Sequence, residues 1–245
     1  MEWNDDGIVL SARKHGESSA IVTLLTRDHG RHAGLVRGGS GRRARGIYQP
    51  GNRLTARWSA RLAEHLGTLG CELTESVAAT LMSDPLKLAG LSAACAVAET
   101  SLPEREPHAP VFEGLAALLG AFHETGWPSA YVKWELGLLK ELGFGLDLSA
   151  CAATGVTEDL TYVSPKSARA VSTEAAEPYK KSLLVLPAFL LIAGAAGEPG
   201  EVADGLTLTG HFLERHVYGH QSHQLPPARQ RLFERLKRQL STKQE

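Results

Sequence analysis

The chain has 245 residues, 43% of them apolar and 22% charged, with 26 basic and 27 acidic side chains. This composition predicts a soluble globular protein that buries its own core, in one large domain or two smaller ones. It excludes a disulfide-stapled secreted protein, because three widely spaced cysteines form no framework, and a membrane protein, because the longest apolar stretch, 183–196, is too short to span a bilayer. The first 20 residues contain no secretory signal, so a cytoplasmic location is expected.

The first 80 residues are typical of a small β-structure. Short runs rich in β-branched residues, separated by polar or glycine-containing turns, predict strands at 7–12, 20–26, 32–37, 53–62 and 69–77. The segment Gly38–Gly46 holds four glycines and three arginines, which favours a mobile basic loop. Five short strands around such a loop fit a small barrel, and the oligonucleotide-binding (OB) fold is the natural candidate.

Positive charge is concentrated in this region. Residues 27–61 carry nine arginines and a single acid, Asp28, so the segment has a charge of +8 although the whole chain has −1. Because arginine is suited to bidentate phosphate contacts, the segment predicts a nucleic-acid-binding surface rather than a merely solvated basic face. The nine arginines are Arg27, Arg31, Arg37, Arg42, Arg43, Arg45, Arg53, Arg57 and Arg61.

The strand predicted at 53–62 alternates between polar and apolar residues. Arginines at every fourth position fall on one face, whereas Trp58 falls on the other and is expected in the core, with base stacking as a minor alternative. At roughly 3.3 Å per residue, neighbouring arginines would stand about 13 Å apart and form a cationic line along the sheet. The predicted DNA contacts are Arg37, Arg42, Arg43, Arg45, Arg53, Arg57 and Arg61.

Electrostatics should dominate over base stacking on this surface. Aromatic residues are only 6% of the chain, and the basic segment offers just Tyr48 and Trp58. Binding that rests on neutralised phosphates has little sequence preference and weakens steeply with salt.

The remainder of the chain is expected to be mainly helical. Apolar residues at helical spacing predict helices at 86–102, 111–124, 129–142, 206–218 and 227–240. Asp84 and Pro85 are a good start signal for the first helix, with aspartate at the N-cap. Residues 146–182 show no regular pattern, and 183–193 predicts a buried helix that begins or kinks at Pro187. The fold class is therefore α+β, with an OB domain at 1–80 and a mainly helical domain at 81–245.

Catalytic signatures are absent from the sequence. No P-loop, GxSxG or HExxH motif occurs. Histidines gather near the C-terminus, but no cysteine or carboxylate completes a familiar ligand set, and surface histidines are the plainer interpretation. The cluster consists of His211, His216, His220 and His223. Cys71 and Cys95 are expected to be buried small hydrophobes. The sequence therefore predicts neither catalytic residues nor a metal site.

Several motifs follow one another in a characteristic order. Those in the first part are Gly7-Ile8-Val9-Leu10, Gly16-Glu17-Ser18-Ser19, Leu24-Leu25-Thr26-Arg27, His29-Gly30-Arg31, Gly34-Leu35-Val36-Arg37-Gly38 and Gln49-Pro50-Gly51. Those in the second part are Trp134-Glu135-Leu136, Leu138-Leu139, Glu141-Leu142-Gly143-Phe144-Gly145, Leu146-Asp147-Leu148, Cys151, and Leu225-Pro226 with Ala228-Arg229. In these motifs the chain resembles, over essentially its whole length, the RecO family of bacterial recombination mediators and DNA repair proteins.

The resemblance implies an N-terminal OB fold, a helical C-terminal domain and a non-catalytic function. Family members bind single- and double-stranded DNA, anneal complementary strands and engage the acidic C-terminal tail of the single-stranded-DNA-binding protein. With RecR they help to load RecA, which implies a cytoplasmic, nucleoid-associated location. The family's tail site lies in the helical domain and combines an apolar groove with basic residues. Lys133 and Arg229 are the candidates here, and Trp134 is expected in the core.

One segment departs from the family pattern. Many relatives carry a four-cysteine zinc site after the third helix, starting with CxxC. Here Thr154 stands where the second cysteine would be, and no cysteine follows Cys151. A single thiolate cannot make a structural zinc site, so no zinc or other cofactor is expected and this region must be held by packing.

Two other functions fit parts of the sequence. The first is an RNA-directed enzyme whose basic OB domain delivers substrate to a site in the helical half, with the histidine cluster as its only candidate and a His216 substitution as its test. The second is a structural adaptor that uses the basic segment against an acidic protein. A catalytic constellation would favour the former, and competition between DNA and a protein for the same arginines would favour the latter.

Overall fold

The computed structural model of the chain describes residues 1–219 and 224–242. They fall into two compact units, Met1–Phe122 with Pro226–Leu232 and His123–Leu225 with Phe233–Glu245. Within the described residues, no helix is both long and apolar enough to cross a membrane.

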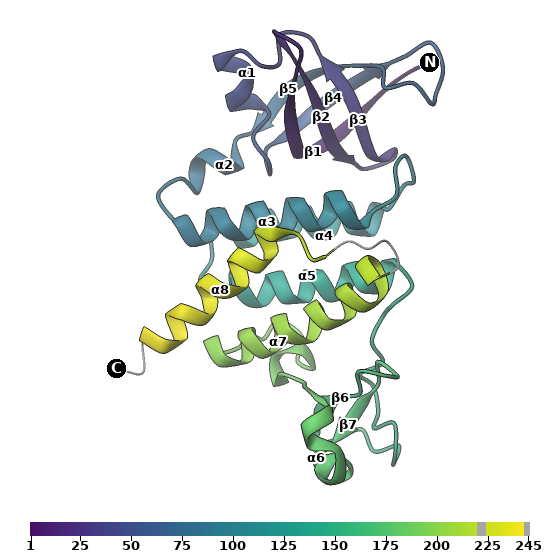
Figure 1. Cartoon of the computed structure of the whole chain (residues 1–245), viewed down its shortest axis with the longest axis vertical. Helices are drawn as coiled ribbons and strands as arrows, with labels where there is room; N and C mark the ends of the chain where they lie inside the picture. Colours follow the sequence, from purple (N-terminus) through teal and green to yellow (C-terminus); the bar gives the residue numbers. More distant parts are fainter. Residues whose placement is uncertain (220–223, 243–245) are drawn as a thin grey trace. The chain divides into compact units, whose positions relative to one another are not determined.

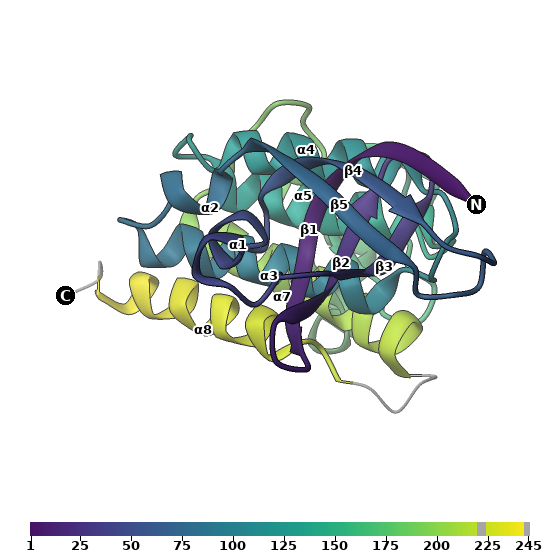
Figure 2. The same ribbon diagram turned by 90° about the horizontal axis from the view of Figure 1, so that it is seen from above.

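A closed five-stranded barrel forms the first part of the first unit (Figures 1 and 2). The strands are β1 (Glu2–His15), β2 (Ser19–Thr26), β3 (Gly30–Val36), β4 (Arg53–Ser59) and β5 (Thr68–Glu75). They are hydrogen-bonded in the order β1-β2-β3-β5-β4, and β4 pairs with β1 to complete the ring. The expected OB architecture and the α+β fold class are thereby confirmed.

Alternating side chains fill the barrel. Val22, Leu24 and Leu54 are at most 1% exposed, and burying each such aliphatic side chain contributes about 1.5–3 kcal/mol. Trp58 is 2% exposed, and its indole N–H donates to the Leu66 carbonyl oxygen at 2.9 Å. The predicted core position of Trp58 is therefore confirmed.

Two strands, β1 and β4, differ most in length from their predictions. β1 begins at Glu2, before the predicted start at Gly7, because its acidic first residues pair with β4. β4 ends at Ser59 rather than at the predicted Leu62. Glu2 is already paired with Ser59, and the Ala60 N–H donates to the Met1 carbonyl oxygen at 3.0 Å, so β1 offers no further residues to pair with. Arg61 consequently lies outside the strand.

Helices complete the first unit: α1 (Arg42–Ile47), α2 (Val77–Thr80), α3 (Pro85–Ser101), α4 (Ala109–Ala121) and the start of α8 (Pro227–Thr242). The Asp84 carboxylate caps α3 as predicted, because it accepts hydrogen bonds from the N–H groups of Leu86 and Lys87 at 3.0 and 3.1 Å. α3 runs across one end of the barrel (Figure 1), and the Ser11 hydroxyl on β1 donates to the Glu99 carboxylate on α3 at 2.5 Å.

The second unit contains α5 (Trp127–Glu141) and α7 (Pro199–Phe212), which pack against each other and are followed by the π-helical turn η3 (Leu213–Tyr218). The fully buried Glu135 carboxylate accepts a hydrogen bond from the fully buried Thr209 hydroxyl at 2.5 Å. The Trp134-Glu135-Leu136 motif thus has a structural part in joining the two helices.

Between these helices the chain forms a small lobe that the sequence analysis missed. Its elements are β6 (Leu160–Val163), β7 (Ala170–Ser172), α6 (Thr173–Ala176), η1 (Glu177–Ser182), β8 (Leu184–Val185) and η2 (Ala188–Leu190), with the sheet order β7-β6-β8. The expectation of irregular structure at 146–182 is wrong, because strands this short leave no readable periodicity. The buried helix predicted at 183–193 is also wrong, since Pro187 disfavours a helix at its predecessor and removes a backbone donor.

Candidate nucleic-acid interface

The arginine-rich segment contains a helix rather than the mobile loop predicted at Gly38–Gly46. Arginine and alanine are good helix formers, and α1 is closed by hydrogen bonds from the Arg45 N–H to the Gly41 oxygen and from the Tyr48 N–H to the Ala44 oxygen, each 3.0 Å. The preceding turn is fixed as well, because the Ser40 N–H donates to the Ser18 oxygen at 3.0 Å. α1 lies outside the ring of strands (Figures 1 and 2).

Asn52 anchors the end of α1. Its side-chain amide donates to the carbonyl oxygens of Gly46 and Ile47, both at 3.0 Å, and so satisfies acceptors at the end of the helix. Its Oδ1 accepts from the Ala78 N–H at 3.1 Å, and the residue is fully buried. A rigid buried amide therefore sets the position of the three arginines on α1.

A cleft of about 700 Å³ lies between α1, the glycine turn and the β1–β2 hairpin, and we call it the basic cleft. Its lining residues are Ala12, Arg13, Lys14, Glu17, Ala20, Gly39, Ser40, Arg45, Tyr48, Gln49 and Pro50. Three cations thus face a single carboxylate. Three further exposed arginines belong to the same part of the chain: Arg42 and Arg43 on α1, and Arg37 after β3.

None of these six cations forms an ion pair with an acid in the part of the chain that the structure describes. Arg45 donates from Nε to the Ser40 carbonyl oxygen at 3.0 Å, which directs its side chain without neutralising it. Exposed guanidinium groups without a carboxylate partner can bind phosphate oxygens with no ion pair to break.

The arginines of β4 have a different environment. The predicted alternation is confirmed for 53–59, but Arg53 forms an ion pair with Glu75 on β5 at 3.4 Å, and Arg57 forms one with Glu2 on β1. Hydrogen bonding from the Arg57 guanidinium lowers the pKa of the Glu2 carboxyl. The neighbouring strands thus supply carboxylates that offset the charge of two of the three arginines in the cationic line predicted along this strand.

Two more arginines of the basic segment are paired with acids. Arg27 lies 3.1 Å from the Glu113 carboxylate, and Arg31 lies 3.4 Å from that of Glu104. Arg61 is exposed in the loop after β4. Of the seven predicted DNA contacts, Arg42, Arg43 and Arg45 thus share α1, and Arg45 lines the basic cleft. Arg37 lies two residues before Gly39 of the cleft lining, whereas Arg53 and Arg57 are paired with acids.

Sequence reasoning missed two residues of the basic cleft, Arg13 and Lys14. They stand at the end of β1, outside the segment with the highest charge, and the fold brings them to α1. The available signal was their position as a basic pair directly before the Gly16 turn.

Aromatic surface is scarce in the basic cleft. Tyr48 lines it but is 7% exposed, and burial raises the pKa of its hydroxyl, which lies beside the Cys71 thiol. A buried ring offers little area for a base to stack on, so phosphate contacts are what this cleft can supply best.

The two candidates for the partner tail belong to different units. Lys133 on α5 is half-buried, and its ammonium group donates to the Ala195 and Ile192 carbonyl oxygens at 2.6 and 3.4 Å. Arg229, in the first turn of α8, is only 3% exposed, so it is not the surface charge that a helix start usually presents. Trp134 is 7% exposed, and its predicted core position is confirmed.

The histidine cluster is only partly described, because His220 and His223 lie outside the described residues. The His216 ring stacks on Phe144 with centroids 4.9 Å apart, and His211 lies one turn earlier on α7. Within residues 1–219 and 224–242, no group of three or more metal-ligating side chains occurs.

The residues around Cys151 do not fit a zinc ion. The Cys151 sulfur accepts hydrogen bonds from the Ser172 N–H at 3.3 Å and from its hydroxyl at 3.4 Å. Burial raises the pKa of this thiol, but hydrogen bonds from Ser172 and Thr154 outweigh burial and lower it to about 6. Cys71 and Cys95, the other thiols, lie in the first unit. The sulfur therefore has hydrogen-bond donors around it where a zinc site needs further thiolates.

Comparison with known proteins gives matches along nearly the whole chain. A family model for the N-terminal part of recombination protein O matches residues 1–77, and a model for its C-terminal part matches residues 82–225. The DNA repair protein RecO of Rhodospirillum centenum is 54% identical, over 99% of this chain and 97% of the relative. RecO of Rhodospirillum rubrum is also 54% identical, over 97% of each chain. RecO of Phenylobacterium zucineum is 54% identical as well, over 96% of this chain and 98% of the relative. The chain therefore belongs to the RecO family of DNA repair proteins.

Proposed function

We propose that this protein is a non-catalytic recombination mediator that binds single- and double-stranded DNA through the basic cleft. The observation that carries the proposal is a set of six exposed cations without acidic partners among the described residues: three line the basic cleft, two more stand on α1, and Arg37 lies in the turn before α1. Arg42, Arg43 and Arg45 provide the main phosphate contacts, supported by Arg13, Lys14 and Arg37. Arg53, Arg57 and Arg61 contribute less, because two of them must first leave a carboxylate.

Strand annealing follows from the same electrostatics. Two complementary strands repel each other through their phosphates, and a cationic surface lowers that repulsion while releasing condensed counterions. Contacts to phosphates position the strands without reading their sequence, so the bases remain available for pairing.

The partners that we propose are those implied by the family resemblance. The protein engages the acidic tail of the single-stranded-DNA-binding protein, acts with RecR and so promotes RecA loading, without a cofactor and in the nucleoid region of the cytoplasm. Lys133 and Arg229 are the proposed basic residues for the tail. Of the two, Lys133 has the more accessible side chain, while Arg229 is nearly enclosed.

A strand-annealing experiment tests the proposal. Two complementary oligonucleotides carrying a donor and an acceptor dye are mixed with the protein, and the rate of energy transfer is recorded. The wild type should accelerate annealing, and the triple variant Arg42→Ala, Arg43→Ala, Arg45→Ala should lose most of that acceleration. Annealing at the uncatalysed rate with the wild type would contradict the proposal.

The tail site is tested separately by anisotropy of a labelled acidic peptide that ends in Asp-Phe. Lys133→Ala should weaken peptide binding, while the matched control Lys140→Ala, on the exposed side of the same helix, should leave it unchanged. Equal effects of the two variants would remove Lys133 from the proposed site.

A further inference from the structure

A second cleft, of about 480 Å³, lies on the barrel at the opposite end of β1 from the basic cleft, and we call it the aromatic cleft. The lining residues that matter here are Trp3, Asp28, His29, His32, Trp58 and Arg105. Four of them carry aromatic rings, and for only one of the four, Trp58, did the sequence offer base stacking as an alternative to a core position. The volume suits a small organic group.

The four rings form one contiguous cluster. Trp3 stacks on His29 with ring centroids 4.3 Å apart and on Trp58 with centroids 5.7 Å apart. His32 meets Trp3 and Trp58 edge-on, at 5.0 and 4.8 Å. Trp3 and His29 are half-buried, so part of this aromatic surface faces the cleft. Flat aromatic walls favour a flat aromatic ligand.

His32 supplies an unused polar function in this apolar setting. It is 4% exposed, and neither ring nitrogen makes a hydrogen bond to any group that the structure describes. Burial and the nearby Arg105 charge lower the pKa of His32 to about 4, and they outweigh the opposing effect of the His29 backbone. At neutral pH the ring is therefore uncharged, with one N–H donor and one acceptor nitrogen.

Such an unpaired buried group costs stability, about 1–3 kcal/mol in general. A native structure contains few of them, and each calls for a reason. A ligand whose edge carries both donors and acceptors would satisfy the ring when it enters the cleft.

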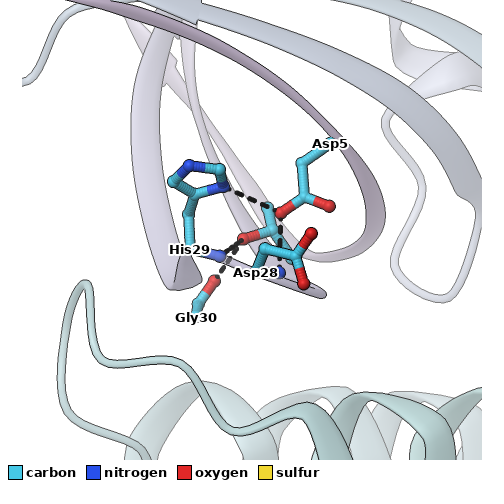
Figure 3. A network of polar contacts seen from close by, with 5 residues as sticks. Asp5, Asp28, His29 and Gly30 are labelled. Carbon is cyan, nitrogen blue, oxygen red and sulfur yellow. Dashed lines mark hydrogen bonds and ion pairs between the residues drawn. The ribbon is translucent and has the colours of Figure 1, made fainter.

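The walls of the aromatic cleft are held in place by a polar network (Figure 3). The buried Asp5 carboxylate contacts His29 Nδ1 at 2.9 Å and accepts a hydrogen bond from the Asp28 N–H at 2.8 Å, so the turn and the His29 ring are fixed together. Gly30 has a φ of +65°, and a side chain there would meet the Glu106 carbonyl oxygen at 1.9 Å. The His29-Gly30-Arg31 motif thus shapes this rim.

The opposite rim is fixed by Arg105. The Arg105 guanidinium donates to the His65 carbonyl oxygen at 2.8 Å and to the Ala63 carbonyl oxygen. The Arg105 backbone N–H donates to the Arg31 carbonyl oxygen at 2.8 Å. The loop after β4 is therefore tied to the segment that follows α3. Both rims are organised before any ligand arrives, which reduces the entropic cost of binding.

Charges at the rim largely offset one another, unlike those of the basic cleft. Glu2 is already paired with Arg57, Asp28 and Arg105 both line the cleft with opposite charges, and the Met1 ammonium donates to the Ala60 carbonyl oxygen at 2.7 Å. A phosphate or an acidic peptide finds little attraction here, whereas a neutral heteroaromatic ring needs no charged partner.

We propose that the aromatic cleft receives one unpaired nucleobase of a bound single strand, which packs against the Trp3 and His29 rings and hydrogen-bonds to His32. The inference rests on the proposed DNA-binding function and adds a base-binding subsite to it. The sugar and phosphates remain outside the cleft, so the subsite favours strands with unpaired bases over duplex.

The test compares two labelled oligonucleotides of equal length and charge, one of thymidylates and one of abasic residues. The wild type should bind the base-bearing strand about tenfold more tightly, in line with the stacking of one base. His32→Leu should reduce that ratio and leave affinity for the abasic strand unchanged. The matched control His123→Leu, at an exposed position outside the first unit, should keep the wild-type ratio.

Equal binding of both strands by the wild type would overturn the base subsite while leaving phosphate-driven binding intact. An undiminished ratio in His32→Leu would overturn the role of His32. Failure of the wild type to bind either strand would remove the proposed DNA-binding function and the subsite with it. The wild-type comparison needs no substitution, so it stands even where a variant folds poorly.

Discussion

His32 should make stability depend on pH. Burial lowers its pKa in the folded protein to about 4 from the usual 6.5, so between these values the unfolded chain binds more protons than the folded one. Stability is then fully present above about pH 6.5 and falls as the pH is lowered towards 4, by a total of about 3 kcal/mol. His32→Leu should lack this loss and be at least as stable as the wild type at neutral pH. Urea unfolding of both proteins across this range checks it, and parallel pH profiles would contradict it.

Cys151 makes a second prediction at the scale of single residues. Its sulfur accepts two hydrogen bonds from Ser172, and Cys151→Ala would leave both buried donors unpaired at a cost of about 1–3 kcal/mol. Because Ser172 and Thr154 surround the sulfur and no further thiolate joins it among the described residues, a chelator should leave the melting temperature of the wild type unchanged. A clear drop of that temperature with chelator, restored by zinc, would show that the lobe depends on zinc.

At the scale of elements, α1 depends on Asn52. Replacing this residue by leucine removes two hydrogen bonds to carbonyl oxygens of the helix end and one from the Ala78 N–H. We expect the free energy of unfolding to fall by roughly 2–4 kcal/mol, since buried polar groups lose their partners. DNA affinity should fall with it as the arginines of α1 lose their fixed position. Asn4→Leu, at an exposed position of β1, is the matched control and should behave like the wild type in urea unfolding.

Among the elements, the sequence predicts some features of the fold and of the candidate site but not others. The barrel strands and the cap at Asp84 were readable because alternation and capping are local signals. The ion pairs of Arg53 and Arg57 were not, because they depend on the register of β4 with β5 and β1, which a single strand does not reveal. Only part of the basic cleft could be predicted, because Arg13 and Lys14 stand on β1 and come close to α1 only when the β1–β2 hairpin folds. The special position of His32 could not be predicted, because only the folded structure shows that its buried ring nitrogens lack hydrogen-bond partners.

At the scale of the whole molecule, the OB domain at 1–80 and the helical domain at 81–245 stay a prediction. The first compact unit extends to Phe122, because the residues after α3 are hydrogen-bonded to Arg31 on β3. The Arg105 backbone N–H donates to the Arg31 carbonyl oxygen, and the Arg31 guanidinium donates to the Leu102 carbonyl oxygen, each at 2.8 Å. Limited proteolysis should therefore spare the chain near residue 80. Rapid cleavage there into two stable fragments would favour the simpler division.

The distribution of charge over the molecule decides how it binds DNA. Four of the nine arginines in residues 27–61 are paired with acids. Of the other five, three stand on α1 beside the basic cleft, which Arg45 lines. The decisive experiment is anisotropy of a labelled single strand between about 50 and 200 mM salt. It compares the wild type, the triple variant Arg42→Ala, Arg43→Ala, Arg45→Ala, and the double variant Arg53→Ala, Arg57→Ala.

Because each phosphate contact on a single strand contributes about 0.7 to the slope of log affinity against log salt, the triple variant should lose about 2 from that slope. The double variant should stay close to the wild type, since its arginines are already neutralised by Glu75 and Glu2. A double variant that loses as much of the slope as the triple variant, or a triple variant that loses none, would show that DNA does not bind at the basic cleft.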